Sequence, residues 1–117
     1  MSYLKVFTLI LIFAGELFAI YAEMIGAKMH AISSQNFSQV FLKMLPIMII
    51  AGALLITGYI FGYRAFKNIW IVSAVSITSI LIIEPILAWV VFQQVPTTGA
   101  LIGFILGAIG LFASLYF

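Results

Sequence analysis

Four long apolar runs, separated by short polar connections, dominate the sequence. They lie at about residues 4–27, 42–63, 69–92 and 99–117. None alternates apolar and polar positions with the period of two that a membrane barrel strand shows, so helices are predicted. A helix needs about 20 mostly apolar residues to cross about 30 Å of hydrocarbon. The pattern therefore predicts an all-α membrane protein in which residues 1–117 form one domain of four transmembrane helices.

The connections between the runs carry polar residues and turn formers. Residues 33–36 read Ser-Ser-Gln-Asn, residues 64–68 form a basic link, and residues 93–98 form a polar turn. Pro46 falls in the first turn of the predicted second span, where a missing N–H costs no helical hydrogen bond. Thr98 is a candidate N-cap for the last span. These connections leave no room for a soluble domain.

The composition supports a membrane protein and excludes several functions. The chain is 66% hydrophobic and 7% charged, with a mean hydropathy of +1.32, whereas about a quarter of a soluble domain is charged. Five Lys or Arg and three Glu give a net charge of +2, which is too few and too scattered to bind nucleic acid. With no Cys, no Asp and one His, the usual catalytic and metal-binding clusters cannot be built. We expect no enzyme activity, metal or cofactor.

Basic residues are nearly balanced between the two sides of the predicted membrane domain. With four spans, both termini share a side with the second connection, which places Lys5, Arg64 and Lys67 there and Lys28 and Lys43 opposite. An excess of three basic residues over two can be enough to fix one orientation of the chain in the membrane. A near balance also suits a chain that inserts both ways and forms an antiparallel homodimer with inverted symmetry.

Glutamates within the predicted spans are the main candidates for function, because an ionised side chain at mid-bilayer costs about 2.5–3.5 kcal/mol even on lenient scales. Glu16 lies about twelve residues into the first span, far from basic side chains, and is the first choice. Glu23 follows seven residues later on the same helical stripe. It lies late in the span, so a boundary salt bridge with Lys28 or Lys43 is an equal alternative.

Glu84 lies past the middle of the third span, directly before Pro85. The proline removes the hydrogen bond to the Leu81 carbonyl and is expected to kink the helix, leaving a free acceptor beside the carboxylate. This arrangement predicts the wall of a binding site. Alternatively, Glu84 is a hydrogen-bonded group that joins helices.

The three carboxyl groups suggest proton-coupled transport. Desolvation and neighbouring like charges favour the neutral form of a carboxyl group, so a site can hold a proton or a cation in turn. Such competition couples the two movements if the protein opens alternately to each side. Ala19 leaves space beside the glutamate stripe. Tyr59 and Trp89 are candidates for lining a cavity, or else anchors at the membrane interface.

Small residues recur at helical spacing in two spans. In the last span the glycines are Gly99, Gly103, Gly107 and Gly110. Three glycines spaced by four predict a close-packed helix face, either within the chain or between subunits. Gly58 and Gly62 form a shorter example in the second span.

Residues 84–110, EPILAWVVFQQVPTTGALIGFILGAIG, resemble the closing helix pair of the drug/metabolite transporter superfamily: a Glu-Pro, a polar turn and a glycine-rich last helix. Residues 22–26, AEMIG, look like the first-helix glutamate motif of its small multidrug resistance branch. The resemblance implies a four-helix subunit, usually an antiparallel dimer joined through its last helices, that exchanges protons for cationic or polar compounds. The local motif places the family glutamate on Glu23, whereas depth in the span places it on Glu16.

The resemblance also implies a bacterial inner-membrane location, with lipid, protons, a small substrate and a second copy as partners. The family's glycine-broken third helix is not reproduced, and Pro85 is a possible substitute. Another branch of similar size contains subunits that flip lipid-linked sugars across the membrane, so a lipid-linked sugar is an alternative substrate. A different hypothesis is a non-transporting small subunit that binds a larger membrane complex through the glycines of the last span.

Overall fold

The chain folds into helices joined by short connections. The computed structural model describes residues 3–31 and 35–117, with residue 115 described by its backbone alone. The helices are α1 (Tyr3–Ala31), α2 (Phe37–Phe66), α3 (Ile69–Phe92) and α4 (Thr98–Tyr116). Across the described residues there is no strand, so the predicted all-α class is confirmed.

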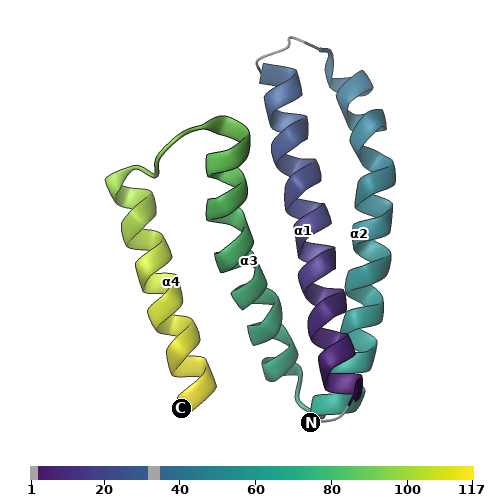
Figure 1. Cartoon of the computed structure of the whole chain (residues 1–117), viewed down its shortest axis with the longest axis vertical. Helices are drawn as coiled ribbons and strands as arrows, with labels where there is room; N and C mark the ends of the chain where they lie inside the picture. The colour runs from purple at the N-terminus through teal and green to yellow at the C-terminus, as the bar shows by residue number, and fades with distance from the viewer. Residues whose placement is uncertain (1–2, 32–34) are drawn as a thin grey trace.

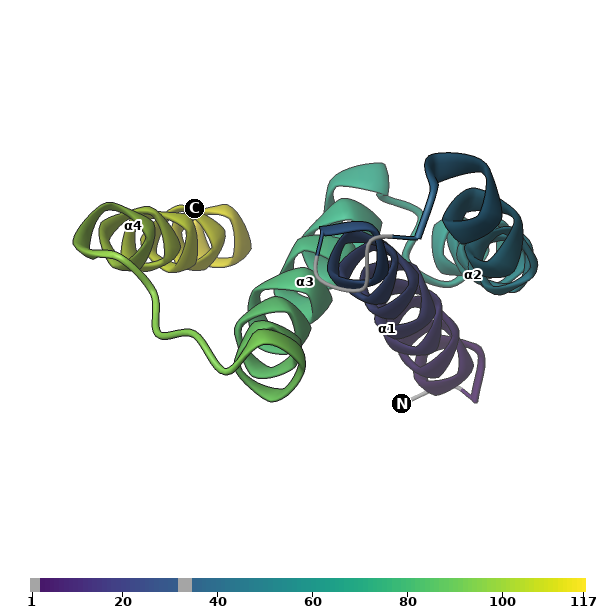
Figure 2. The same cartoon turned by 90° about the horizontal axis from the view of Figure 1, so that it is seen from above.

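Successive helices run in opposite directions, so α1 and α3 are parallel and both termini lie at one end (Figure 1). We call this end the terminal end. Helix α1 packs against both α2 and α3, whereas α4 packs against α3. Seen from above, α4 stands apart from the other three helices (Figure 2). The chain is therefore a three-helix unit with a fourth helix attached along one side.

Three of the helices are long and apolar enough to cross a membrane: α1, α2 and α3, with 29, 30 and 24 residues. Their outward side chains are mostly large and apolar, as in Ile10, Phe41 and Ile86. These features fit an integral membrane protein. Helix α4 has a shorter apolar stretch, Thr98–Ser114.

Helix α2 begins earlier than its hydropathy predicts. The Asn36 side chain accepts a hydrogen bond from the Gln39 backbone N–H at 3.0 Å, which satisfies a free donor of the first turn and starts the helix at Phe37. Pro46 consequently lies inside the helix, in its third turn. The prediction that Pro46 occupies the first turn is wrong, and the proline removes one helical hydrogen bond there.

The start of α4 differs by one residue from the prediction. The Thr97 side chain accepts a hydrogen bond from the Ala100 backbone N–H at 3.1 Å, so Thr97 is the N-cap. Thr98 is the first helical residue rather than the cap. A threonine N-cap accepts a hydrogen bond from the backbone N–H three residues later, and Ala100 is three residues after Thr97.

Two glycines of α2 lie in close contact with α1. A Cβ atom added to Gly58 would lie 2.7 Å from Ile12 Cγ1, and one added to Gly62 would lie 2.9 Å from Thr8 Cγ2. Ile12 and Thr8 are fully buried. The Gly58 and Gly62 pair therefore lets α1 and α2 approach closely within the chain.

The glycines of α4 meet almost nothing in the described part of the chain. A Cβ atom added to Gly99, Gly103 or Gly110 finds no atom within 4 Å, and one added to Gly107 lies 3.5 Å from Leu81 Cδ2. The predicted packing face thus has no close helix partner within the chain. A contact between subunits stays a prediction.

Candidate functional site

Glu16 is tied to α3 by a hydrogen bond in the middle of the bundle. Ser76 Oγ donates to Glu16 Oε1 at 2.8 Å. Ser76 is buried, and Glu16 is partly buried. The carboxylate predicted to be the main functional group thus lies between two helices and has a polar partner there.

Ser76 was not predicted as a site residue, although α3 is rich in hydroxyl groups. Thr78 and Ser79 donate to the carbonyl oxygens of Ala74 and Val75, four residues earlier in the same helix, at 2.6 and 2.9 Å. Ser76 instead donates across to α1. Small hydroxyl residues on an apolar helix commonly join helices, and this was the available signal in the sequence.

Glu23 and Glu84 lie at a similar height in the bundle. Helices α1 and α3 are parallel (Figure 1), and Glu16 faces Ser76, so seven residues further on Glu23 is level with Ile83, the neighbour of Glu84. At about 1.5 Å per residue, this level is about 10 Å from Glu16 along the helix axis. Glu23 interacts electrostatically with Glu84 and, less strongly, with Glu16. The fold therefore brings the three predicted carboxylates into one region.

The lysines near Glu23 form hydrogen bonds with other groups. Lys28 Nζ donates to the Val91 carbonyl oxygen on α3 at 2.9 Å. Lys43 Nζ donates to Gln35 Oε1 at 3.0 Å. The boundary salt bridge proposed for Glu23 is not among these contacts. Lys28 instead joins α1 to α3, further from the terminal end than Glu23 and Glu84.

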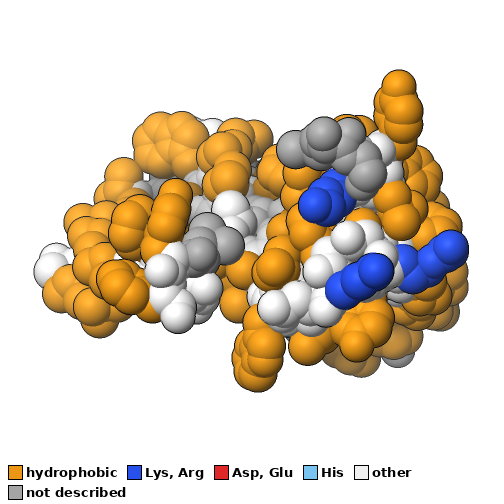
Figure 3. All heavy atoms as spheres, turned by 90° about the horizontal axis from the view of Figure 1, so that it is seen from below, with side chains coloured by type: hydrophobic (Ala, Val, Ile, Leu, Met, Phe, Trp, Pro, Cys, Tyr) orange, Lys and Arg blue, Asp and Glu red, His pale blue; other side chains and the backbone are white. Residues whose placement is uncertain are grey.

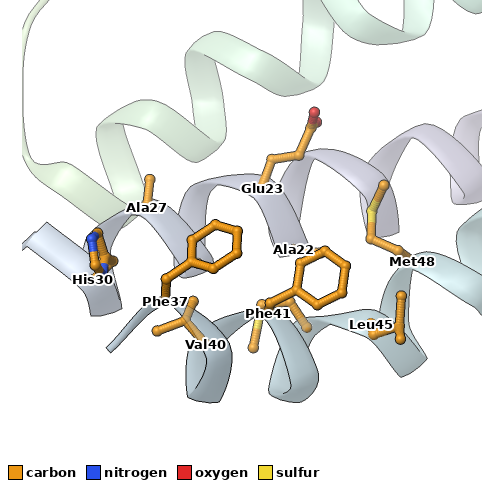
Figure 4. A pocket seen from close by; sticks show the side chains of 11 residues that line it. Ala22, Glu23, Ala27, His30, Phe37, Val40, Phe41, Leu45 and Met48 are labelled. Carbon is orange, nitrogen blue, oxygen red and sulfur yellow. The ribbon is translucent and has the colours of Figure 1, made fainter. Parts of the chain in front are cut away.

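Glu23 borders a hollow between α1 and α2, which we call the α1–α2 hollow. Its volume is about 330 Å³, and apart from Glu23 and His30 its lining side chains are apolar. Figure 4 shows the Glu23 side chain pointing away from α2, whose residues Phe37 and Phe41 present their rings to the hollow. The Glu23 side chain is exposed and lies at the border of the hollow, while the methionine and aromatic side chains that line the hollow suit the apolar body of an amphipathic cation.

Glu84 borders a different hollow, between α3 and α4, of about 460 Å³. Pro85 and Trp89 also line it, so the cavity-lining position predicted for Trp89 is present in the fold. We call it the acidic α3–α4 hollow. Ala19 is buried on α1, and Tyr59 is partly exposed on α2; neither lines the hollows described here.

The carboxylates do not converge on a single point. Within residues 3–31 and 35–117, no three His, Asp or Glu side chains lie close enough together to hold a metal ion. Glu16 lies at one level, and Glu23 and Glu84 lie at another, each of the latter two at the edge of its own hollow.

The Glu16–Ser76 hydrogen bond gives a first testable prediction. Ser76→Ala removes the donor and leaves the Glu16 oxygen without it, and this should lower the free energy of unfolding by about 1 kcal/mol, as for hydrogen bonds between membrane helices. The measurement is denaturant unfolding in detergent micelles, followed by helical circular dichroism. Ser38→Ala, at an exposed position in the first turn of α2, is the control, and equal effects of the two substitutions would contradict the prediction.

These features define a class: a small α-helical protein of membrane character, with ionisable groups between its helices. Comparisons with protein families, with curated proteins and with solved structures found no match for this chain. Its particular function must therefore be inferred from its own residues.

Proposed function

We propose that the chain is a small-molecule membrane transporter, which exchanges a cationic or polar compound for protons by alternating access. In this proposal α4 is the fourth span and the working unit is a homodimer of the drug/metabolite transporter type. The observation that carries the proposal is the position of Glu23, at the edge of an apolar hollow and in electrostatic range of two other carboxylates.

The chemistry of the α1–α2 hollow supports a cation with an apolar body. Val40, Met44 and Met48 offer apolar surface, while the Glu23 carboxylate offers a negative charge at its border. Three carboxyl groups close together in a medium of low dielectric repel one another when all are ionised. Proton binding or cation binding relieves this repulsion, so the two ligands compete for the same region.

Glu16 couples protonation to the packing of α1 on α3. The Glu16 carboxyl group accepts from Ser76, and a hydrogen bond with an ionised acceptor is stronger than one with a neutral acceptor. Protonation of Glu16 weakens that attraction and lets α1 and α3 separate more easily. A change of contact that depends on charge is what alternating access requires.

The homodimer is proposed to form through α4, and this gives a second prediction. A Cβ atom added to Gly103 finds no atom of another helix within 4 Å in the described structure, so Gly103→Leu should leave the monomer folded and reduce dimer formation at least about tenfold, because close helix approach in membranes needs small residues. Förster transfer between labelled chains in liposomes measures the dimer. Ile102→Leu, on an exposed part of the same helix, is the control, and undiminished transfer would contradict the prediction.

A second candidate function is a non-transporting subunit of a larger membrane complex. The observation that favours it is the isolation of α4, which in the described structure packs only against α3 and exposes most of its side chains. Under this alternative the purified chain transports nothing, and Gly103→Leu releases it from a different protein rather than from a second copy.

Reconstitution of the purified chain in liposomes tests the proposed function. A pH gradient, acidic inside, should drive uptake of benzyltrimethylammonium, an aromatic quaternary ammonium ion that keeps its charge at any pH. The interior should become less acidic as the cation enters. Uptake no greater than in protein-free liposomes would overturn proton-coupled transport of cations.

A further inference from the structure

A second hollow between α3 and α4 lies at the terminal end. Its volume is about 610 Å³, and its lining includes Asn68, Trp70 and Ser73 from α3 and its cap, and Gly110 and Ser114 from α4. We call it the terminal α3–α4 hollow. It is separate from the hollows bordered by Glu23 and Glu84, and the proposed transport makes no use of it.

The polarity of this hollow is graded along the helices. Asn68 and Ser114, at its outer end, are polar, whereas Ala74, Ile77 and Leu111 line it further from the terminal end. The absence of side chains at Gly107 and Gly110 keeps α4 from filling the space. A ligand that fits this gradient has a polar group at the terminal end and an apolar chain that runs inward between the helices.

Basic side chains lie at the same end of the molecule as the polar end of the hollow. Lys67 caps α2 and directly precedes Asn68, and Arg64 lies in the last turn of α2. Both are exposed. Figure 3, which views this end, shows the Lys and Arg side chains on the side of it away from α4, and no acidic side chain is in view among the described residues. The ligand's polar group should therefore be anionic.

The acidic α3–α4 hollow, at the other end of the same helix pair, provides a comparison for the terminal α3–α4 hollow. Glu84 lines it, and no Lys or Arg is among the residues that line it in the described structure. One tryptophan borders each hollow: Trp70 at the terminal end and Trp89 at the acidic one. The two hollows thus differ in charge, and each contains its own fluorescent reporter.

We propose that the terminal α3–α4 hollow binds an anionic phospholipid, with an acyl chain between α3 and α4 and the phosphate near Lys67 and Arg64. Basic sites between membrane helices select anionic headgroups in this way, with an affinity gain of about fivefold for each charge near the surface. This site rests on the proposed fourth span but is independent of transport, so either can fail without the other.

Quenching by brominated lipids tests the proposal. The full chain carrying Trp89→Phe, so that Trp70 alone fluoresces, is reconstituted with brominated phosphatidylglycerol or with brominated phosphatidylcholine. Quenching of Trp70 should show a preference of about 30-fold for the anionic lipid. This preference should fall about fivefold with Lys67→Gln and about fivefold again with Arg64→Gln, and it should weaken as the salt concentration rises.

The matched control carries Trp70→Phe, so that Trp89 reports on the acidic hollow, where no preference for the anionic lipid is expected. Gly110→Leu, which fills the terminal hollow, should reduce quenching of Trp70 by both lipids. Equal quenching of Trp70 by the two lipids, or a preference that survives both charge substitutions, would overturn the proposal. So would protection of Trp70 from both lipids, as expected if a second copy of the chain fills the hollow.

Discussion

Glu23→Gln is expected to reduce proton-driven uptake of benzyltrimethylammonium by about 30-fold or more, because in the proposed mechanism the cation loses its negatively charged partner. Glutamine keeps the size and hydrogen-bonding capacity of the side chain but can neither ionise nor exchange a proton. Glu23 borders the α1–α2 hollow with its side chain pointing away from α2 (Figure 4), so the substitution removes the negative charge at the border of the hollow. Uptake into liposomes with equal amounts of inserted protein measures the effect.

Two further variants test whether the loss of uptake is specific to the Glu23 charge. Glu23→Asp retains the charge and should keep a measurable part of the uptake, whereas Lys43→Gln changes a charge that is hydrogen-bonded to Gln35 and should leave uptake unchanged. Helical circular dichroism should show the same helix content in all three variants. Normal uptake by Glu23→Gln would remove Glu23 from the proposed mechanism.

The second large effect is expected at the contact between α1 and α2. Gly58→Leu places a Cβ atom 2.7 Å from Ile12 Cγ1 and 3.4 Å from the Ile12 backbone nitrogen, so relief requires the two helices to move apart. Overpacking of this kind costs about 1–3 kcal/mol, and more where backbone blocks the way. We expect a loss of about 3 kcal/mol in the free energy of unfolding, measured by denaturant titration in micelles.

Gly52 provides the matched control on the same helix. A Cβ atom added there meets no atom within 4 Å, so Gly52→Leu should change the free energy of unfolding by less than about 0.5 kcal/mol, as for other surface substitutions. Leucine has a higher helix propensity than glycine, so equal destabilisation by the two leucines would contradict the contact with Ile12 as the cause of the cost at Gly58.

Continuous apolar runs were sufficient to predict the number and order of the helices. Their ends were harder to predict, because the start of α2 depends on the Asn36 cap, while the polar residues around Phe37 resemble a connection in hydropathy alone. Pro46 was misplaced for the same reason. A capping residue that precedes a mixed polar and aromatic segment is the signal that would have moved the boundary.

Glycine spacing did not reveal which glycines contact another helix. Gly58 and Gly62 form the shorter motif and contact α1, whereas the longer series from Gly99 to Gly110 meets almost nothing within the chain. Spacing places small residues on one face of a helix, but the arrangement of neighbouring helices decides what that face meets. That arrangement depends on contacts between segments far apart in the sequence.

The candidate site was predictable in its residues but not in its geometry. Glu16, Glu23 and Glu84 stand out because acids are rare in membrane helices. Their relative heights follow from the register of α1 against α3, which the Glu16–Ser76 hydrogen bond reveals. Ser76 resembles Thr78 and Ser79 in sequence, and only the packed structure shows that its hydroxyl group reaches another helix.

Competition between protons and a cation is tested most directly by proton release. When benzyltrimethylammonium is added to the purified chain in weakly buffered detergent, protons should be released in proportion to the cation bound. The chain carrying both Glu16→Gln and Glu23→Gln should release none. Binding of the cation without proton release at any pH between about 5 and 9, or equal release by the doubly substituted chain, would contradict exchange at these carboxyl groups.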